Sequence, residues 1–262
     1  MALQPESRWT QPSQGWGRTA GADAAAIDAG LRAYMLRVYN WMASGLLLTG
    51  IIAYLIAHTP GVSELFYTVV RTPRGPAPAP TILGYVAMFA PLAFVLALSF
   101  GINRMSKTTV QAVFWAFAAV MGASMANIFV IYTSSSIAST FFISSAMFAS
   151  MSLIGYTTKR DLTKMGSFLM MGLIGIILAS LVNIFLASPA VAFAISILGV
   201  LIFCGLTAYD TQRIKNDYVE YSYAEGTDEA GKRSVMDALG LYLNFINMFQ
   251  FLLSLMGSRN QN

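Results

Sequence analysis

The sequence predicts an all-α polytopic membrane protein with seven transmembrane helices. Of its 262 residues, 56% are hydrophobic and only 11% are charged, and the mean hydropathy is +0.60. A soluble domain averages about 25% charged residues, so this chain falls outside that class. Stretches of roughly 20 apolar residues, which suffice to cross a hydrocarbon core of about 30 Å, occur seven times.

The seven predicted spans cover residues 34–57, 81–102, 108–132, 137–158, 166–187, 190–209 and 235–257. The intervals 108–158 and 165–209 contain no charged residue, yet each is too long for one crossing, so each is expected to form a helical hairpin. Residues 133–136 and the pair Ser188-Pro189 are the expected turns. The longest non-apolar insertions are 58–80, which is rich in proline, and 211–234, where charges and tyrosines cluster.

Residues 1–30 are predicted to form a disordered cytoplasmic tail, and residues 31–258 the membrane domain. The tail contains Gln, Pro, Ser, Gly and Ala without a continuous apolar core, which is not the pattern of a signal peptide. Cys204 is the one cysteine and lies in an apolar run. An intramolecular disulfide and a multi-thiolate metal site are therefore excluded.

The distribution of lysine and arginine predicts the orientation, because cytoplasmic connections retain positive charge. With the N-terminus in the cytoplasm, 13 of the 16 basic residues fall on the cytoplasmic side, and only Arg71, Arg74 and Arg259 lie outside. The C-terminus is then expected outside. We attribute the net charge of +4 to this asymmetry and to contact with anionic lipid, not to nucleic-acid binding. The short connections and the lack of a signal peptide favour a bacterial inner membrane.

Asp210 and Asp237 are the two carboxylates that lie within or at the edge of strongly apolar segments. An ionisable group at membrane depth is costly unless it is paired, hydrated or protonated, so each marks a candidate site. The predicted topology brings both to one membrane face, together with Arg104 after the second span. Two alternatives stay open. Asp210 could form an ordinary interfacial ion pair with Arg213 or Lys215, and Asp237 could be stabilised by the positive end of a helix dipole.

A polar stripe is predicted along the seventh span. Asp237 and Asn244 are seven residues apart in the sequence. That spacing leaves them about 20° from eclipsed on a helix of 3.6 residues per turn, with Gly240 between them on the same face. Asn247 lies near the edge of the stripe, and Asn183 in the fifth span is a further candidate for a polar contact within the bundle. Asp237, Asn244 and Asn247 are therefore the predicted polar positions of a pore.

Four segments carry a specific combination of motifs: Gly155-Tyr-Thr-Thr-Lys-Arg-Asp-Leu-Thr-Lys-Met-Gly-Ser-Phe-Leu169, Gly172-Leu-Ile-Gly175, the Tyr209-Asp210 run before Gln212 and Ile214, and Leu241-Tyr-Leu-Asn-Phe-Ile-Asn-Met-Phe249. The combination resembles the Bax inhibitor-1 family, also called the transmembrane Bax inhibitor motif family, over about residues 33–257. The resemblance implies a seven-helix fold with the last helix at the centre of two three-helix layers. It also implies a pH-sensitive calcium leak through the bundle.

The resemblance also assigns residue roles. In bacterial members a carboxylate pair acts as the pH sensor, and Asp210 matches its first position, whereas Asn244 stands where the second aspartate would be. An arginine at the cytoplasmic end of the second span can latch the first aspartate, and Arg104 matches it. Because Asn244 cannot titrate, we expect a weaker or shifted pH dependence. One carboxylate fewer should also weaken a calcium site, so the metal contact that the sequence suggests is a transient one at Asp210.

The predicted function is a membrane cation leak, for calcium, regulated by pH through a carboxylate–arginine latch. We expect no enzymatic activity and no cofactor, with calcium or protons as the permeant or regulatory ions. An intramembrane aspartyl protease would need a Gly-x-Gly-Asp motif, and a retinal protein a lysine in the last span; both are missing. The serious alternative is a non-transporting membrane protein of this family that binds and modulates a membrane quality-control protease or another membrane partner. The lipid bilayer is the other expected partner.

Overall fold

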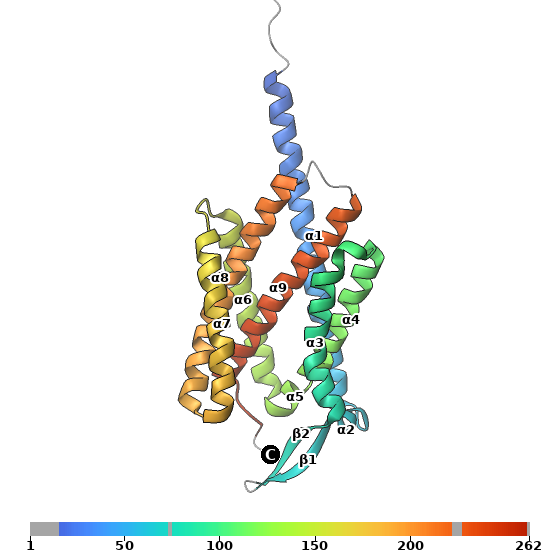
Figure 1. The fold of residues 1–262 in the computed structure, drawn as a ribbon, viewed down its shortest axis with the longest axis vertical. Coiled ribbons are helices and arrows are strands. Elements are labelled where there is room, and N and C mark those ends of the chain that lie inside the picture. Colours follow the sequence, from blue (N-terminus) through green and yellow to red (C-terminus); the bar gives the residue numbers. More distant parts are fainter. Residues whose placement is uncertain (1–15, 73–74, 222–226, 261–262) are drawn as a thin grey trace, which may run out of the picture.

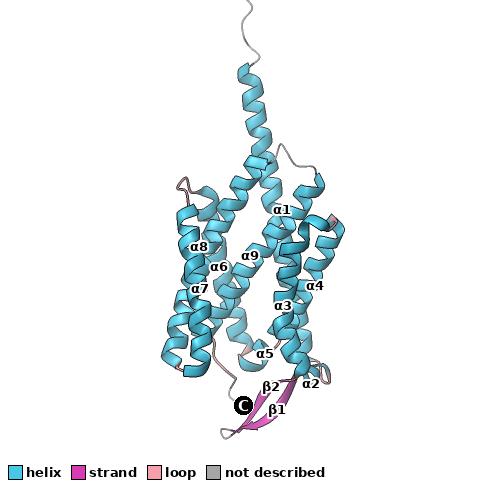
Figure 2. Cartoon of the chain, viewed as in Figure 1, coloured by secondary structure: helices cyan, strands magenta, loops and turns pink. Residues whose placement is uncertain are grey.

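A computed structural model of the protein describes residues 16–72, 75–221 and 227–260. Helices make up nearly all of this part of the chain (Figure 2), and seven of them are long and apolar enough to cross a membrane. They are α1 (Trp16–His58), α3 (Ile82–Gly101), α4 (Lys107–Met125), α6 (Ser134–Thr157), α7 (Thr163–Leu186), α8 (Pro189–Tyr221) and α9 (Thr227–Met256). The prediction of an all-α protein with seven spans is confirmed.

The remaining elements are short. The 3-10 helix η1 (Ile102–Arg104) extends α3, and α5 (Asn127–Ile131) extends α4. Between α1 and α3 lie α2 (Val62–Phe66) and an antiparallel hairpin of β1 (Tyr67–Thr72) and β2 (Gly75–Pro80). The sequence indicated only a proline-rich insertion here. Prolines at every second position of β2 leave the backbone donors of the alternating alanines for the partner strand, which explains how this segment pairs.

The last helix, α9, lies at the centre of the bundle (Figure 1). It packs against α8, α1, α6 and α4, while α3 packs on α4 and α7 packs on α8. In an apolar window of 18 residues within α9, 56% of the residues are buried, against 6% in the corresponding window of α7. The helices therefore form one group of α1, α3 and α4 and another of α6, α7 and α8, with α9 between them, as the resemblance implied.

A buried hydroxyl network joins α9 to the first group of helices. The Tyr242 hydroxyl on α9 lies 2.7 Å from the Thr49 hydroxyl on α1, which in turn donates a hydrogen bond of 2.8 Å to the Ala118 carbonyl on α4. The rings of Phe114 and Phe117 pack edge-on against Tyr242. Because every polar group of this contact has a partner, the tyrosine can be fully buried without an unsatisfied hydroxyl.

Both predicted turns are present, but only the second joins two helices that pack on each other, α7 and α8. The first is shorter than predicted, because residues 134–136 already belong to α6, and it connects α4 and α5 to a helix of the other group. The Thr133 side chain caps the start of α6 by accepting a hydrogen bond from the backbone N–H of Ser136. At the other turn, α7 ends at Ala187, which has a left-handed backbone with φ of 47°, and α8 begins at Pro189. Proline suits the first position of a helix because its missing N–H has no partner there in any case.

Three helices extend beyond the apolar spans predicted from the sequence. Residues 16–30, expected to belong to a disordered tail, form the first part of α1, consistent with the high helix propensity of their many alanines; the rest of that tail, 1–15, lies outside the described residues. α8 continues past residue 209 to Tyr221, and α9 begins at Thr227 instead of near 235. The hydropathy of the sequence locates the apolar part of a helix. It does not locate the residues at which the helical hydrogen bonds begin and end.

The two ends of the described chain lie at opposite ends of the bundle (Figure 1). The segment after α9 runs back along the α5–α6 junction, where the Ser258 carbonyl accepts from the Thr133 N–H at 3.0 Å and the Asn260 N–H donates to the Ile131 carbonyl at 2.9 Å. We call the end with this segment and the hairpin the C-terminal end of the bundle, and the other the N-terminal end. An odd number of crossings requires this arrangement.

Candidate functional site

Asp210 lies where α8 contacts α9, and its side chain is 14% exposed. Carboxylate oxygen Oδ2 accepts a hydrogen bond of 2.7 Å from Asn244 Nδ2 on α9. The other oxygen, Oδ1, lies 3.1 Å from Arg213 Nη2. Each carboxylate oxygen therefore has a donor, one neutral and one charged, which offsets part of the cost of burying the group.

Arg213 reaches Asp210 because the two residues are one turn apart on α8. Its side chain is 44% exposed, so the ion pair lies at the boundary between the bundle and solvent. Gly240 on α9 faces the guanidinium: a methyl group added at this glycine would lie 3.9 Å from Nη2. This is an ordinary van der Waals distance, so Gly240 lies beside the arginine without being required for its placement.

Asp237 occupies the same face of α9, nearer the N-terminal end of the bundle. Its Oδ2 accepts a hydrogen bond of 2.6 Å from the Tyr34 hydroxyl on α1. Arg213, Asp217 and Arg233 are the charged groups that act on it. Arg213 therefore acts on both carboxylates, and these residues form one polar site across α1, α8 and α9.

The dipole explanation for Asp237 is wrong. It assumed that this residue opens the seventh helix, but α9 begins ten residues earlier, at Thr227. The field of a helix terminus acts mainly within its first turn. The carboxylate is instead held by a side-chain hydroxyl and by charges on neighbouring turns.

The structure pairs Asp210 with Arg213, the interfacial pairing that the sequence left open, and Arg104 does not take part in this pair. Arg104 is exposed at the end of η1. It follows α3, which packs on the outer side of α4, so it belongs to the other group of helices. The assignment of Arg104 as the latch stays a prediction.

The other two predicted polar positions bond locally. Asn247 Nδ2 donates a hydrogen bond of 2.8 Å to the Leu243 carbonyl of its own helix, and the Asn247 side chain is half-buried. Asn183 accepts a hydrogen bond of 3.1 Å from the backbone N–H of Ser188 and so closes the α7–α8 turn instead of contacting another part of the bundle. Of the predicted stripe, Asp237 and Asn244 join the site with Asp210.

A second polar contact, which sequence reasoning missed, holds the loop between α6 and α7. Gln212 accepts from the Leu162 N–H and donates to the Arg160 carbonyl, both at 2.8 Å. Lys215 Nζ donates a hydrogen bond of 2.9 Å to the Tyr156 carbonyl. In the same loop, hydrogen bonds from Thr163 to the carboxylate hold the pKa of Asp161 below its ordinary value. These hydrogen bonds fix the turns of α8 that carry the candidate site to the end of α6 and to the α6–α7 loop.

Comparisons with known proteins identify the family. The family model described as inhibitor of apoptosis-promoting Bax1 matches residues 31–261. An uncharacterized protein of Caulobacter vibrioides is 46% identical over 95% of this chain and 98% of its own length. The inner membrane protein YbhL of Escherichia coli K12 is 44% identical over 88% of this chain and 94% of its own length. The chain belongs to the Bax inhibitor-1 family.

Within the Bax inhibitor-1 fold, the geometry shows what an amide at position 244 does locally. The residue at this position faces the Asp210 carboxylate at hydrogen-bonding distance. A carboxyl group there could donate only when protonated, whereas an amide N–H donates at every pH. The hydrogen bond from Asn244 to Asp210 is thus available at every pH, and the carboxyl of Asp210 is the one titrating group of this contact.

No group of three or more His, Cys, Asp or Glu side chains that could hold a metal ion occurs within residues 16–72, 75–221 and 227–260. The oxygens best placed to bind a cation are those of the Asp210 carboxylate, with the Asn244 amide beside it. The guanidinium of Arg213 occupies the position that a cation would take against Asp210. A calcium ion would therefore have to compete with this arginine.

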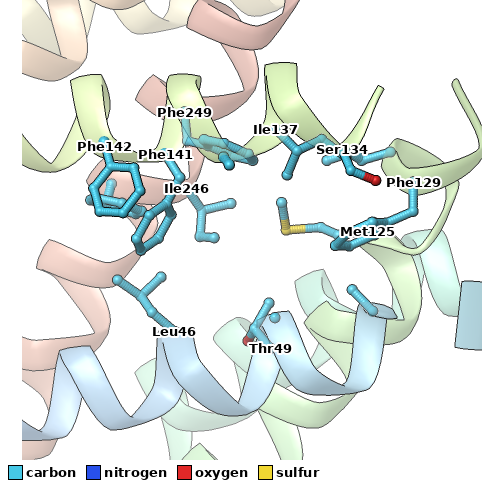
Figure 3. A pocket seen from close by; sticks show the side chains of 15 residues that line it. Leu46, Thr49, Met125, Phe129, Ser134, Ile137, Phe141, Phe142, Ile246 and Phe249 are labelled. Carbon is cyan, nitrogen blue, oxygen red and sulfur yellow. The ribbon is translucent and has the colours of Figure 1, made fainter. Parts of the chain in front are cut away.

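The Bax inhibitor-1 bundle also contains an apolar cavity of about 310 Å³ near its C-terminal end (Figure 3). Its 15 lining residues come mainly from α1, α5, α6 and α9, and none is charged. Among the labelled side chains only Thr49 and Ser134 carry an oxygen, and the others are phenylalanines, isoleucines, a leucine and a methionine. Such a lining suits hydrocarbon and not a hydrated cation, so this cavity does not continue the polar site.

Proposed function

We propose that this protein permits a proton-regulated leak of cations, calcium among them, across an inner membrane, with its N-terminus in the cytoplasm. Its membership of the Bax inhibitor-1 family supports a membrane function, and the name of YbhL supports the inner membrane. The observation that carries the proposal is the Asp210 carboxylate, held inside the bundle between Arg213 and Asn244. A buried ionisable group with a charged partner is the arrangement expected of a sensor.

Protonation of Asp210 opens the site in this proposal. The neutral acid no longer attracts the guanidinium, which stays charged at every physiological pH. Because Arg213 is 44% exposed, it can turn outward to water once the pair is broken. The position that it leaves, between α8 and α9, then becomes available to a hydrated cation with oxygen ligands from Asp237 and Asn244.

The amide of Asn244 leaves a single titrating group in its contact with Asp210. Two facing carboxylates would share one proton and lose their protons in two coupled steps. With a permanent amide donor, only Asp210 titrates within the pair. We therefore expect a shallower pH dependence than in a chain with aspartate at both positions.

Calcium influx into liposomes that contain the purified protein and an internal dye tests the proposal. Flux from about pH 6 to 8, a range in which a carboxyl in an apolar environment can titrate, is compared between the wild type, Asp210→Asn and Asn244→Asp. We expect pH-dependent flux in the wild type, loss of the pH response in Asp210→Asn and a steeper response in Asn244→Asp. Asp161→Asn is the matched control, because that carboxylate is exposed in the α6–α7 loop.

Absence of flux in the wild type, with flux only in Asn244→Asp, would contradict the leak. It would favour the alternative of a non-transporting protein that modulates a membrane protease or another membrane partner. Deletion of residues 1–24 then tests the alternative: loss of the cellular phenotype in a deletion variant that still reaches the membrane supports a partner bound through the N-terminal segment.

A further inference from the structure

A second hollow, distinct from the apolar cavity, opens at the N-terminal end of the bundle between α1, α4, α8 and α9. Its volume is about 640 Å³, and polar and apolar groups share its wall. Arg37 and Trp41 line it from α1, Lys107 and Gln111 from α4, Tyr218 from α8 and Ser234 from α9. We call it the basic pocket. It touches the candidate site only through Tyr34, which lines the pocket and donates to Asp237.

The charge of the basic pocket is positive. The charged groups that line it are Arg37 and Lys107. Lys107 forms an ion pair of 3.4 Å with Asp228, whose side chain is 80% exposed, so this pair is weakened by water and salt. Within the described part of the chain, no carboxylate is paired with Arg37. The pocket therefore offers one arginine fork and one largely available ammonium group.

Aromatic rings provide a second kind of surface in the same pocket. The rings of Tyr34 and Tyr218 lie 5.0 Å apart at 34°, and Trp41 packs edge-on against Phe114 behind the wall. Gly30 allows this arrangement, because a methyl group there would collide with the Tyr218 hydroxyl. The pocket thus combines two cations with amphipathic rings, the residue types that suit a polar anion attached to a less polar body.

Glycine also positions the lysine. A methyl group at Gly231 on α9 would lie 2.6 Å from Lys107 Cε and 3.2 Å from its Nζ, so the absent side chain lets the lysine stem lie directly against α9. The ammonium is thereby held at the wall of the pocket instead of extending freely into solvent. A positioned cation costs less entropy on binding than a mobile one.

We propose that the basic pocket binds a phosphate-bearing anion, held by Arg37 and Lys107, with its less polar part against Tyr218 and Trp41. Phosphate suits the pair because arginine offers a planar two-pronged donor and lysine a point charge. The volume accommodates a substituted phosphate and exceeds what a carboxylate alone would fill. The pocket opens at the end of the bundle, so the phosphate can belong to a lipid headgroup or to a soluble compound.

Binding would act on the candidate site through Tyr34. The Tyr34 hydroxyl donates to Asp237, and the Tyr34 ring packs at a tilt against Tyr218 in the pocket wall, so an occupant that moves the ring also moves the donor. The regulatory consequence rests on the proposed cation leak, whereas the binding itself does not. A binding experiment therefore separates the failure of one from the failure of the other.

Two arms identify the source of the phosphate. In the first, the full chain in phosphatidylcholine nanodiscs is titrated calorimetrically with inorganic pyrophosphate and with adenosine monophosphate. In the second, native mass spectrometry counts phosphatidylglycerol molecules retained by the protein after release from nanodiscs that contain equal parts of phosphatidylglycerol and phosphatidylcholine. Saturable binding of one soluble probe indicates a soluble ligand, and selective retention of one phosphatidylglycerol indicates a headgroup; either result supports the proposal.

Substitutions locate the site. We expect Arg37→Gln and Lys107→Gln each to weaken binding roughly tenfold or more, since each removes a charge-assisted contact. Gln111→Glu should do the same by adding a negative charge to the wall without removing a cation. The matched controls are Arg160→Gln and Lys164→Gln, exposed cations of the α6–α7 loop region at the same end of the bundle.

Thermal unfolding of each variant verifies that the fold is intact, which is expected because Arg37 is exposed and Lys107 is only partly covered. The proposal is overturned if neither arm detects binding in the wild type. It is also overturned if the control substitutions weaken binding as much as those in the pocket, because the interaction would then be a general attraction to the positive end of the bundle.

Discussion

At the scale of single residues, two arginines are candidates for the partner of Asp210. Arg213 lies 3.1 Å away on the same helix, while Arg104 is exposed beyond α3. Removing the nearer positive charge makes the ionised carboxylate less favourable, so Asp210 should take up its proton more readily. We expect Arg213→Gln to move the protonation midpoint of Asp210 to higher pH by about 1, since an adjacent opposite charge typically accounts for a change of this order or more. Calcium flux should lose its pH dependence in the same variant, because the guanidinium that closes the site is missing.

Arg104→Gln is the matched variant, and it should leave the midpoint where it is. The infrared carbonyl band of protonated Asp210, identified by its absence in Asp210→Asn, gives both midpoints without requiring flux. A change in Arg104→Gln, combined with none in Arg213→Gln, would show that the family latch operates and that the pair seen here does not control protonation.

How far the site could be predicted depends on how its residues are related in the sequence. Asp210 and Asn244 were found because charge and amide groups stand out in apolar segments and because both fall in family motifs. Arg213 was named only as an alternative, although its spacing of three residues from Asp210 allowed the pair. Tyr34 left no signal, because it lies 203 residues from Asp237 and is one of 12 tyrosines.

At the scale of helices, the close contact of α6 and α8 depends on Gly155. A methyl group at this position would collide with the backbone of Ala208, whose Cα would lie 2.9 Å away, and a backbone cannot turn aside as a side chain can. Gly155→Ala should therefore separate the two helices and destabilise the fold by about 1–3 kcal/mol, the usual cost of overpacking. The thermal unfolding midpoint in detergent should fall by several degrees.

Gly175→Ala on α7 is the control, because nothing lies within 4 Å of the position that its methyl group would take. It should unfold at the wild-type temperature or slightly above, since alanine favours a helix over glycine. Equal unfolding temperatures for the two variants would mean that α6 and α8 adjust to the added methyl group, and that the glycine is not required for this packing.

The lengths of the helices show why the sequence located the spans but not their ends. Seven apolar stretches, two pairs of which are joined by uncharged turns, follow from the cost of exposing polar backbone to hydrocarbon, so these features were predictable. The extensions of α8 and α9 beyond the predicted spans carry charged residues that hydropathy counts against a span. Those extensions bring Asp210 and Asp237 into the middle of long helices, which changed the interpretation of Asp237.

At the scale of the whole molecule, basic residues are distributed unequally between the two ends of the bundle. The hairpin and the segment after α9 lie at the C-terminal end of the bundle. At the other end lie the α6–α7 loop with Arg160 and the first turns of α4, α7 and α9, which carry Lys107, Lys164 and Lys232. The positive-inside tendency therefore predicts that the hairpin is outside and the α6–α7 loop inside. This orientation also determines which compartment supplies the anion of the basic pocket and the proton of Asp210.

Cysteine labelling tests the orientation, since the native Cys204 is buried and gives little background. Thr68→Cys on the exposed part of β1 and Lys164→Cys at the start of α7 place one thiol at each end of the bundle. A membrane-impermeant maleimide should label the first in intact bacterial spheroplasts and the second only after permeabilisation. The reverse pattern would place the basic pocket and Arg213 outside the cytoplasm, so that Asp210 would respond to external pH, and a soluble cytoplasmic phosphate could no longer be the ligand.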